Sequence, residues 1–252
     1  MAEHLFIVTG ASRGLGAALV DRLLVPGHTL LCIARRVPAA LEEEAAIRGA
    51  RLERWNADLA DPVPVAARLQ QWLAAFDPGA LAGATLINNA ALLTRIGPLG
   101  SGDDGELSAS LRVSLEAPML LTAAFLRATR GWTAPRRILG MSSGLGRRAM
   151  AGTASYCAAK AGLDHFSRAV ALEEAQHPNG ARIVSLAPGV VDTDMQVQLR
   201  GADAQGFPDR PTFISLKESG QLSSAEDAAT RVLAFLARPD FGRHPVADIR
   251  DP

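Results

Sequence analysis

Residues 9–16, Thr9-Gly10-Ala11-Ser12-Arg13-Gly14-Leu15-Gly16, form a glycine-rich turn on which the interpretation of the whole chain depends. The turn follows an apolar run at 5–9 and precedes an amphipathic stretch at 15–24, so it joins a predicted strand to a predicted helix. Glycine permits tight turns and close approach of a ligand, and the N–H groups at a helix N-terminus favour a phosphate. The spacing G-x-x-x-G-x-G differs from the dinucleotide fingerprint G-x-G-x-x-G, and an ordinary strand–helix turn is the alternative explanation. Its place after the first strand favours a cofactor site made by Gly10, Ser12, Arg13, Gly14, Leu15 and Gly16.

Strand-like and helix-like segments alternate along the rest of the chain. Apolar runs predict strands at 29–34, 52–55, 84–87, 137–141, 182–186 and 245–249. Helices are predicted at 38–48, 62–76, 106–129 with a kink or break at Pro118, 153–176, and from the capping-box spacing of Ser223 and Glu226 to 238. This alternation predicts an α/β fold, a single Rossmann-type doubly wound parallel sheet with helices on both faces, in one domain over residues 1–252. The polar segment 196–221 has no clear period, and it predicts a partly ordered flap over a site.

The composition argues against several kinds of partner, namely nucleic acids, membranes and metals. The 252 residues carry 26 Lys+Arg and 26 Asp+Glu, so no overall field favours nucleic acid or an acidic membrane surface. The two cysteines, Cys32 and Cys157, are too few for a disulfide framework, and the histidines lack metal-ligand spacing. The N-terminus lacks the pattern of a secretory signal, and no uninterrupted apolar stretch reaches membrane-spanning length. We therefore expect a cytoplasmic protein without a bound metal.

The end of the second predicted strand indicates which dinucleotide would bind. An acidic residue there would accept a hydrogen bond from a ribose 2′-hydroxyl and select NAD, but the sequence reads Ile33-Ala34-Arg35-Arg36. Arg35 and Arg36, together with Arg13, can pair with a 2′-phosphate. The pattern favours NADP(H), and a solvated basic pair is the alternative.

Three side chains further along the chain suggest proton transfer. Tyr156 and Lys160 are four residues apart, so on a helix they share one face, and a nearby ammonium favours the phenolate and lowers the phenol pKa. Ser143 follows a predicted strand, and its hydroxyl can hydrogen-bond a substrate carbonyl. Taken singly, the tyrosine fits a half-buried core aromatic and the serine fits an ordinary turn.

Taken together, these motifs resemble the short-chain dehydrogenase/reductase family. The resemblance runs from about residue 5 to the C-terminus. It rests on residues 9–16, Asp58-Leu59, Asn88-Asn89-Ala90-Ala91, Ser143, Tyr156 with Lys160, and Pro188-Gly189. The string from Ala187 to Gln196 and the ending from Phe241 to Asp251 are similar to the sepiapterin reductase and benzil reductase branch.

The resemblance implies a role for each matching residue. Tyr156 would donate a proton to the substrate oxygen, Lys160 would lower the Tyr156 pKa and bind the nicotinamide ribose, and Ser143 would orient the carbonyl. The cofactor would also contact Asp58, Leu59, Asn89, Ala90, Pro188, Gly189, Val191 and Thr193. The substrate would lie against Ser143, Gly144, Tyr156 and Gly189, with Asp248 at the position of a pterin-anchoring aspartate or, alternatively, a surface carboxylate. Members often pair across long helices, so a homodimer or homotetramer is expected, here through the helices beginning near Glu106 and Thr153.

One departure leaves alternatives open. The family often has an asparagine where this chain has Ser114, and that asparagine helps to hold a proton-relay water near the lysine. The leading hypothesis is an NADPH-dependent reductase of a ketone or dicarbonyl with a Ser-Tyr-Lys catalytic set, in which Ser114 occupies the relay position. The alternatives are an NADP(H)-binding regulator or scaffold with little turnover, and a secondary-alcohol dehydrogenase.

Overall fold

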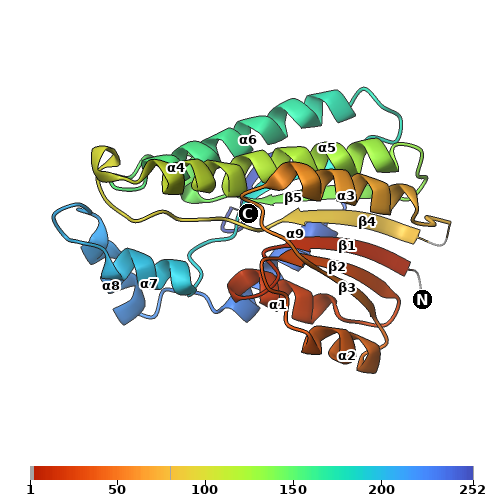
Figure 1. Cartoon of the computed structure of the whole chain (residues 1–252), viewed down its shortest axis with the longest axis horizontal. Coiled ribbons are helices and arrows are strands. Elements are labelled where there is room, and N and C mark those ends of the chain that lie inside the picture. The colour runs from red at the N-terminus through yellow and green to blue at the C-terminus, as the bar shows by residue number, and fades with distance from the viewer. Residues whose placement is uncertain (1–2, 80, 252) are drawn as a thin grey trace.

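Parallel strands form the centre of the molecule in a computed structural model that describes residues 3–79 and 81–251. Within those residues seven strands pair in the order β3-β2-β1-β4-β5-β6-β7 (Figure 1). Their bounds are β1 (Glu3–Thr9), β2 (His28–Ala34), β3 (Arg51–Asn56), β4 (Leu81–Asn88), β5 (Arg136–Met141), β6 (Arg182–Ala187) and β7 (Val246–Asp248). Every pairing is parallel, which requires each connection to cross over a face of the sheet.

Helices cover both faces of this sheet. Helices α1 (Gly14–Leu23), α2 (Ala40–Ile47) and α9 (Ala225–Ala237) enclose one apolar core, and α3 (Pro62–Ala74), α5 (Ala117–Thr129) and α6 (Ala154–Glu174) enclose the other (Figure 1). The strands have almost continuous apolar burial, as expected for a sheet covered on both sides. The predicted doubly wound parallel sheet is confirmed.

The long helix expected at 106–129 is interrupted. Helix α4 (Asp104–Leu111) is followed by a π-helical turn, η2 (Arg112–Glu116), and α5 begins one residue before Pro118. Proline has no N–H to donate and is tolerated in the first turn of a helix, so the break falls where the sequence predicted it. The segment Asp104–Thr129 is apolar and long enough to cross a membrane by composition, but half of its most apolar window is buried inside the protein.

The segment predicted as a partly ordered flap contains two helices, α7 (Asp194–Gly201) and α8 (Arg210–Glu218). Its buried Leu199, Phe207 and Phe213 pack in a third apolar cluster with Leu93 and Tyr156. No single period spans the segment, because Gly201, Gly206 and Pro208 separate the two short helices. Both helices lie beyond the carboxyl edge of the sheet (Figure 1).

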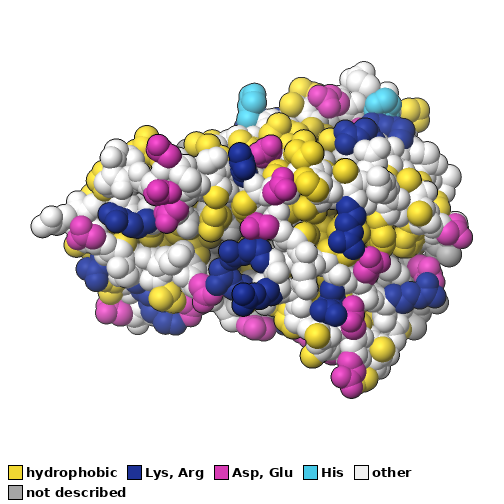
Figure 2. Space-filling view, viewed as in Figure 1, with side chains coloured by type: hydrophobic (Ala, Val, Ile, Leu, Met, Phe, Trp, Pro, Cys, Tyr) yellow, Lys and Arg dark blue, Asp and Glu magenta, His cyan; other side chains and the backbone are white. Residues whose placement is uncertain are grey.

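The surface carries mixed charge. Figure 2 shows basic and acidic side chains interspersed over one face of the molecule, in keeping with the equal totals of 26 and 26. Within the described residues, no group of three or more His, Cys, Asp or Glu side chains is placed to hold a metal ion.

The turn after β1 fits tightly against the end of β4. A Cβ atom at Gly16 would lie 2.1 Å from the Gly10 carbonyl oxygen and 2.6 Å from Asn89 Nδ2. Chain connections leave β1 toward β2 and later return to β4, and at such a switch point doubly wound sheets bind ligands in a crevice at the carboxyl ends of the strands. Glycine at position 16 therefore lets α1 begin close beneath that crevice.

We predict that Gly16→Ala lowers the free energy of unfolding by about 1–3 kcal/mol, the range typical of overpacking, because the added methyl cannot fit against Gly10 and Asn89. Thermal unfolding without cofactor measures the change. The matched control is Gly201→Ala in α7, where no heavy atom lies within 4 Å of the added Cβ. Equal stability of the two variants would contradict the tight packing.

Candidate active site

A buried hydroxyl joins the glycine-rich turn to the end of β4. Thr9 Oγ1 accepts hydrogen bonds from Asn89 N and Ala90 N, both at 3.0 Å. The Asn89 side chain returns the contact, since its Nδ2 donates to Thr9 O at 3.0 Å and to Gly10 O at 3.3 Å. Asn89 and Ala90 therefore lie against the turn, as expected, and Thr9 is a positioning residue that the candidate set did not include.

The N-terminus of α1 is suited to an anion. No side chain caps it, its first turn contains no acidic residue, and the turn leading into it has positive φ at Gly10 (66°) and Gly14 (54°). The uncapped N–H groups and the helix dipole favour a pyrophosphate. These residues fit the phosphate portion of a dinucleotide.

Arg13 has a partner in this structure. Its Nη1 lies 2.8 Å from Asp194 Oδ2, and the two side chains are 69% and 70% exposed. An exposed ion pair of this kind contributes little to stability, so a phosphate can replace Asp194 as the partner of Arg13 at small cost. The contact links the glycine-rich turn to the first residue of α7.

The ends of β2 and β3 place the remaining predicted cofactor residues on the same edge. Arg35 and Arg36 are exposed just after β2, whereas Asp58 is exposed and Leu59 is buried just after β3. The two strand ends are tied together, because Asn56 Oδ1 accepts a hydrogen bond from Val37 N at 2.9 Å. The basic pair is therefore exposed to solvent at the carboxyl end of β2.

The candidate proton donor, Tyr156, is buried in the first turn of α6. Burial raises the pKa of Tyr156 to about 12, and a hydrogen bond with the Ser143 hydroxyl opposes that rise. Ser143 is held at the end of β5, where its Oγ also accepts from Leu145 N at 3.2 Å. The Lys160 ammonium lies over the phenol ring, 5.4 Å from its centroid, and its effect on the Tyr156 pKa stays a prediction. Tyr156 is therefore a neutral phenol at neutral pH.

Lys160 is enclosed one helical turn further along. Its Nζ donates to the carbonyl oxygen of Met141, the last residue of β5, at 2.6 Å. Burial lowers the pKa of Lys160 to about 8, and the charge of Asp164 opposes this. The structure therefore brings Ser143, Tyr156 and Lys160 together at the junction of β5 and α6.

Ser114 has a different set of contacts. It lies fully buried in the π-helical turn, where its Oγ accepts from Leu92 N at 3.0 Å and lies 3.5 Å from Leu92 O. Among the described residues its hydroxyl makes no hydrogen bond with Lys160. The turn nevertheless packs closely on α6, because a Cβ at Gly162 would lie 2.9 Å from Leu115 Cδ2.

The loop after β6 lies across the glycine-rich turn. Pro188 and Gly189 follow β6 directly, and Gly189 has φ of 85°. Val191 is buried and forms an isolated bridge with Ser223, while Thr193 Cγ2 would lie 3.2 Å from a Cβ at Gly14. This loop therefore forms one wall of the crevice between the sheet edge and α7.

Asp248 ends β7 at the same edge but is already engaged. Arg250 donates to both carboxylate oxygens, at 2.8 and 2.7 Å, and Arg147 lies at 3.6 Å. The hydrogen bond from Arg250 is the main reason that the pKa of Asp248 is lowered. A ligand amine would have to compete with Arg250 for this carboxylate.

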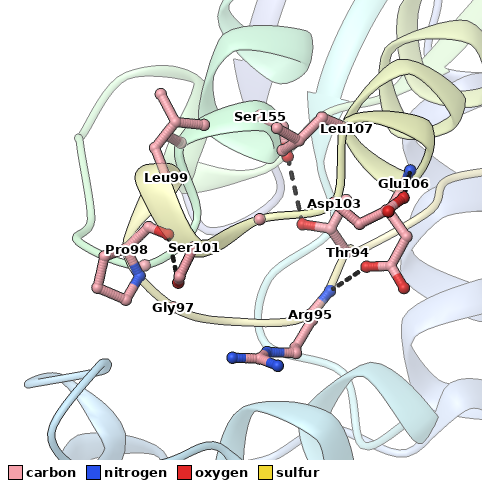
Figure 3. Close-up of a pocket in the computed structure, with 13 residues that line it drawn as sticks. Thr94, Arg95, Gly97, Pro98, Leu99, Ser101, Asp103, Glu106, Leu107 and Ser155 are labelled. Atoms are coloured by element: carbon pink, nitrogen blue, oxygen red, sulfur yellow. Dashed lines mark hydrogen bonds between the residues drawn. The ribbon is translucent and has the colours of Figure 1, made fainter.

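A small pocket of about 140 Å³ opens beside the first turn of α6 (Figure 3). Thr94 Oγ1 and Ser155 Oγ lie 3.4 Å apart in it, and Arg95 N donates to Glu106 Oε2 at 3.3 Å. Figure 3 shows the Arg95 guanidinium directed away from the Glu106 carboxylate. Because Ser155 immediately precedes Tyr156, this pocket adjoins the helix that carries the candidate proton donor.

Comparison with known proteins agrees with this geometry. Residues 4–204 match the family described as short chain dehydrogenase, and the chain belongs to that family. It is 32% identical to a benzil reductase of the (S)-benzoin-forming type from Bacillus cereus, covering 96% of this chain and 98% of the relative. It is also 32% identical to a sepiapterin reductase from Meriones unguiculatus, covering 97% and 95%. A 3-oxoacyl-[acyl-carrier protein] reductase from Brucella melitensis, solved in complex with NAD, superimposes with a TM-score of 0.81 at 22% identity over 99% of this chain and 96% of that one. The chain is therefore an oxidoreductase of the short-chain type, in the branch that contains benzil and sepiapterin reductases.

We predict that the phenol of Tyr156 remains protonated past pH 10, the pH at which an exposed tyrosine is about half ionised. Tyr156 is the only tyrosine, so tyrosinate absorbance reports on it alone. Because its pKa is higher in the folded than in the unfolded state, the native state loses stability as pH rises above about 10. Ionisation near pH 10 in the folded protein, as in the guanidinium-unfolded control, would contradict the burial.

Proposed function

We propose that this protein is an NADPH-dependent carbonyl reductase that acts on a ketone or dicarbonyl. The observation that carries the proposal is the Tyr156 phenol, which is buried, neutral at pH 7 and close enough to the Ser143 hydroxyl at the carboxyl edge of the sheet for that hydroxyl to lower its pKa. A proton donor must hold its proton at the working pH and lie within reach of the reacting oxygen. The benzil and sepiapterin reductases to which the chain is similar support a carbonyl substrate.

The reaction needs a hydride and a proton. When bound, the nicotinamide cofactor supplies the hydride to the carbonyl carbon. The Ser143 hydroxyl donates a hydrogen bond that orients the carbonyl oxygen, and the Tyr156 hydroxyl donates its proton to the same oxygen, giving the alcohol. Lys160 keeps a positive charge beside the phenolate that remains.

The cofactor preference rests on the strand ends. Arg35 and Arg36 are exposed after β2, and the exposed Arg13 lies in the glycine-rich turn. Guanidinium groups pair well with phosphate, and no carboxylate follows β2 to accept from a ribose 2′-hydroxyl. These features favour NADP(H) over NAD(H).

The substrate class has two members that differ in polarity. An aromatic diketone needs only apolar surroundings, such as the cluster of Tyr156, Leu93 and Phe213 offers, whereas a pterin also needs an acceptor such as Asp248. The Arg250 and Arg147 contacts to Asp248 favour the diketone. We expect a cytoplasmic enzyme that forms a homodimer or homotetramer. Met119 of α5 and Leu172 of α6 support the pairing, because they are exposed apolar side chains on the helices expected to meet.

We predict that wild-type protein oxidises NADPH with a panel of ketones and diketones that includes benzil and sepiapterin. Tyr156→Phe loses about a hundredfold or more in kcat, because it removes the proton donor, but keeps its affinity for NADPH. Absorbance of NADPH measures turnover, and fluorescence titration measures binding. Tight NADPH binding without turnover on any substrate would instead favour the regulator or scaffold, and turnover only with secondary alcohols would favour the dehydrogenase.

We also predict that Arg35→Asp lowers the ratio of kcat/KM for NADPH over NADH by about tenfold or more, since a hydrogen bond to a charged group contributes about 1.5–3 kcal/mol. The control is Arg243→Asp, which changes the same charge at an exposed residue before β7. An unaltered ratio in Arg35→Asp would contradict pairing with the 2′-phosphate.

A further inference from the structure

Helix α6 carries a third polar side chain on its catalytic face. Asp164 follows Tyr156 and Lys160 at the same spacing of four residues, so the three lie in one row along the helix. Asp164 is only 2% exposed. An ionised side chain is rarely buried so completely unless it is paired.

The Asp164 carboxylate connects α6 to two neighbouring strands. Ser142 Oγ donates to Asp164 Oδ1 at 2.6 Å, and Ser185 Oγ of β6 donates to the same oxygen at 2.7 Å. Both serines are buried, and Ser142 immediately precedes Ser143. Short bonds from two hydroxyls to one oxygen are typical of an ionised acceptor. The turn that presents Ser143 is therefore held to the catalytic helix by Asp164.

The same carboxylate lies one helical turn from the Lys160 ammonium. Lys160, one turn earlier, is 2% exposed, and its Nζ has Met141 O as a hydrogen-bond acceptor. Burial disfavours the charged form of a lysine, and the negative charge of Asp164 opposes that effect. From the same helix Lys160 also faces the neutral Tyr156 phenol.

Charged groups on other elements face Asp164 rather than Lys160. Arg147, just after the short helix η3 (Gly144–Gly146), lies 3.4 Å from Asp164 Oδ2 through its Nε. Its Nη1 lies 3.6 Å from Asp248 Oδ2 at the end of β7, and Asp248 in turn pairs with Arg250. Asp164, Arg147, Asp248 and Arg250 thus form a row of alternating charges, in which Asp164 is the buried end and Arg250 is exposed.

We propose that Asp164 is a positioning residue for the reductase reaction: its bonds to Ser142 and Ser185 fix the turn that presents Ser143, and its buried negative charge, one helical turn from Lys160, favours the ammonium. The expected effect of Asp164 on turnover rests on the proposed function. The expected effect of the Asp164 charge on the protonation of Lys160 does not depend on turnover.

Direct titration of Lys160 tests the effect on its protonation. The chain contains two lysines, Lys160 and Lys217, so protein labelled with ¹³Cε-lysine gives two side-chain signals, which Lys217→Arg assigns. In wild type we expect Lys160 to titrate at about 8. In Asp164→Asn, which keeps the side-chain shape, we expect the midpoint to fall by about one pH unit or more. The same midpoint in both proteins would overturn the proposal.

A matched control comes from the same helix. Glu174 is 3% exposed and is bonded to Arg130 and Ala181 N at the other end of α6. It lies fourteen residues after Lys160, about 21 Å away along the helix axis. Glu174→Gln removes a buried carboxylate of the same kind, and we expect it to lower stability without moving the Lys160 midpoint. A shift equal to that in Asp164→Asn would mean that general loosening of α6, and not the Asp164 charge, is responsible.

The pH profile of turnover tests the catalytic part. Lys160 is charged below its pKa, so a lower pKa moves the alkaline limb of kcat to lower pH, and we expect a shift of about one unit in Asp164→Asn and none in Glu174→Gln. A fall in kcat without that shift would reduce Asp164 to a structural residue. Absence of wild-type turnover would refute the proposed function, while the lysine titration would still decide the electrostatic claim.

A second variant covers the case in which Asp164→Asn does not fold. Arg147 is partly exposed, and Arg147→Met removes the cation that neutralises Asp164 while keeping an apolar stem. We expect the Lys160 midpoint to rise, opposite in sign to the first variant. An unchanged midpoint in Arg147→Met would contradict the inferred pairing.

Discussion

The enclosure of the Lys160 ammonium between α6 and β5 is the constraint on which the site depends. A buried ammonium must find acceptors, and here it has the carbonyl oxygen of Met141 at 2.6 Å and the charge of Asp164 one turn away. Both require α6 to lie close to the end of β5. The small residue Gly146 makes this approach possible, because a Cβ there would lie 3.0 Å from Asp164 Oδ2 and from Lys160 O. Satisfying the charge therefore also brings Tyr156 to Ser143.

A second junction, between the neighbouring strands β1 and β4, organises the residues expected to bind the cofactor. Thr9, Gly10 and Asn89 exchange hydrogen bonds through main-chain and side-chain atoms, which fixes the end of β4 against the glycine-rich turn. Because β1 and β4 are adjacent and parallel, the two junctions lie on the same edge of one sheet. The sheet thus places both the candidate catalytic side chains and the glycine-rich turn. The loop after β6 and helices α7 and α8 lie beyond the same edge of the sheet.

Much of this arrangement was predictable because it follows from parallel pairing. Residues that end successive strands, such as Asn89, Ser143 and Gly189, must meet at one edge, and the structure brings them there. The break near Pro118 was predictable from the missing N–H. The helices α7 and α8 were not, because each is short and the apolar residues that anchor them, Leu199 and Phe213, contact distant segments.

Side-chain pairing was the least predictable part of the site. The partner of Arg13 is Asp194, 181 residues away, and nothing local in the sequence indicates that contact. Asp164 had a local signal, its spacing of four from Lys160, but a carboxylate at that spacing usually marks an exposed helix face. Only the positions of Ser142, just after β5, and Ser185, on β6, distinguish the buried acceptor from a surface charge.

The two pKa shifts together decide which protonation states the Tyr156–Lys160 pair adopts near neutral pH. In water a lysine holds its proton slightly more tightly than a tyrosine, with pKa values of about 10.4 and 10. Here the order is reversed by a wide margin, because burial lowers the Lys160 pKa to about 8 and raises that of Tyr156 to about 12. Below pH 8 the pair is ammonium and phenol, which is the form that donates a proton to a carbonyl oxygen. The charge of Asp164 opposes the effect of burial on Lys160, and it therefore helps to keep the ammonium present over the pH range in which the phenol is neutral.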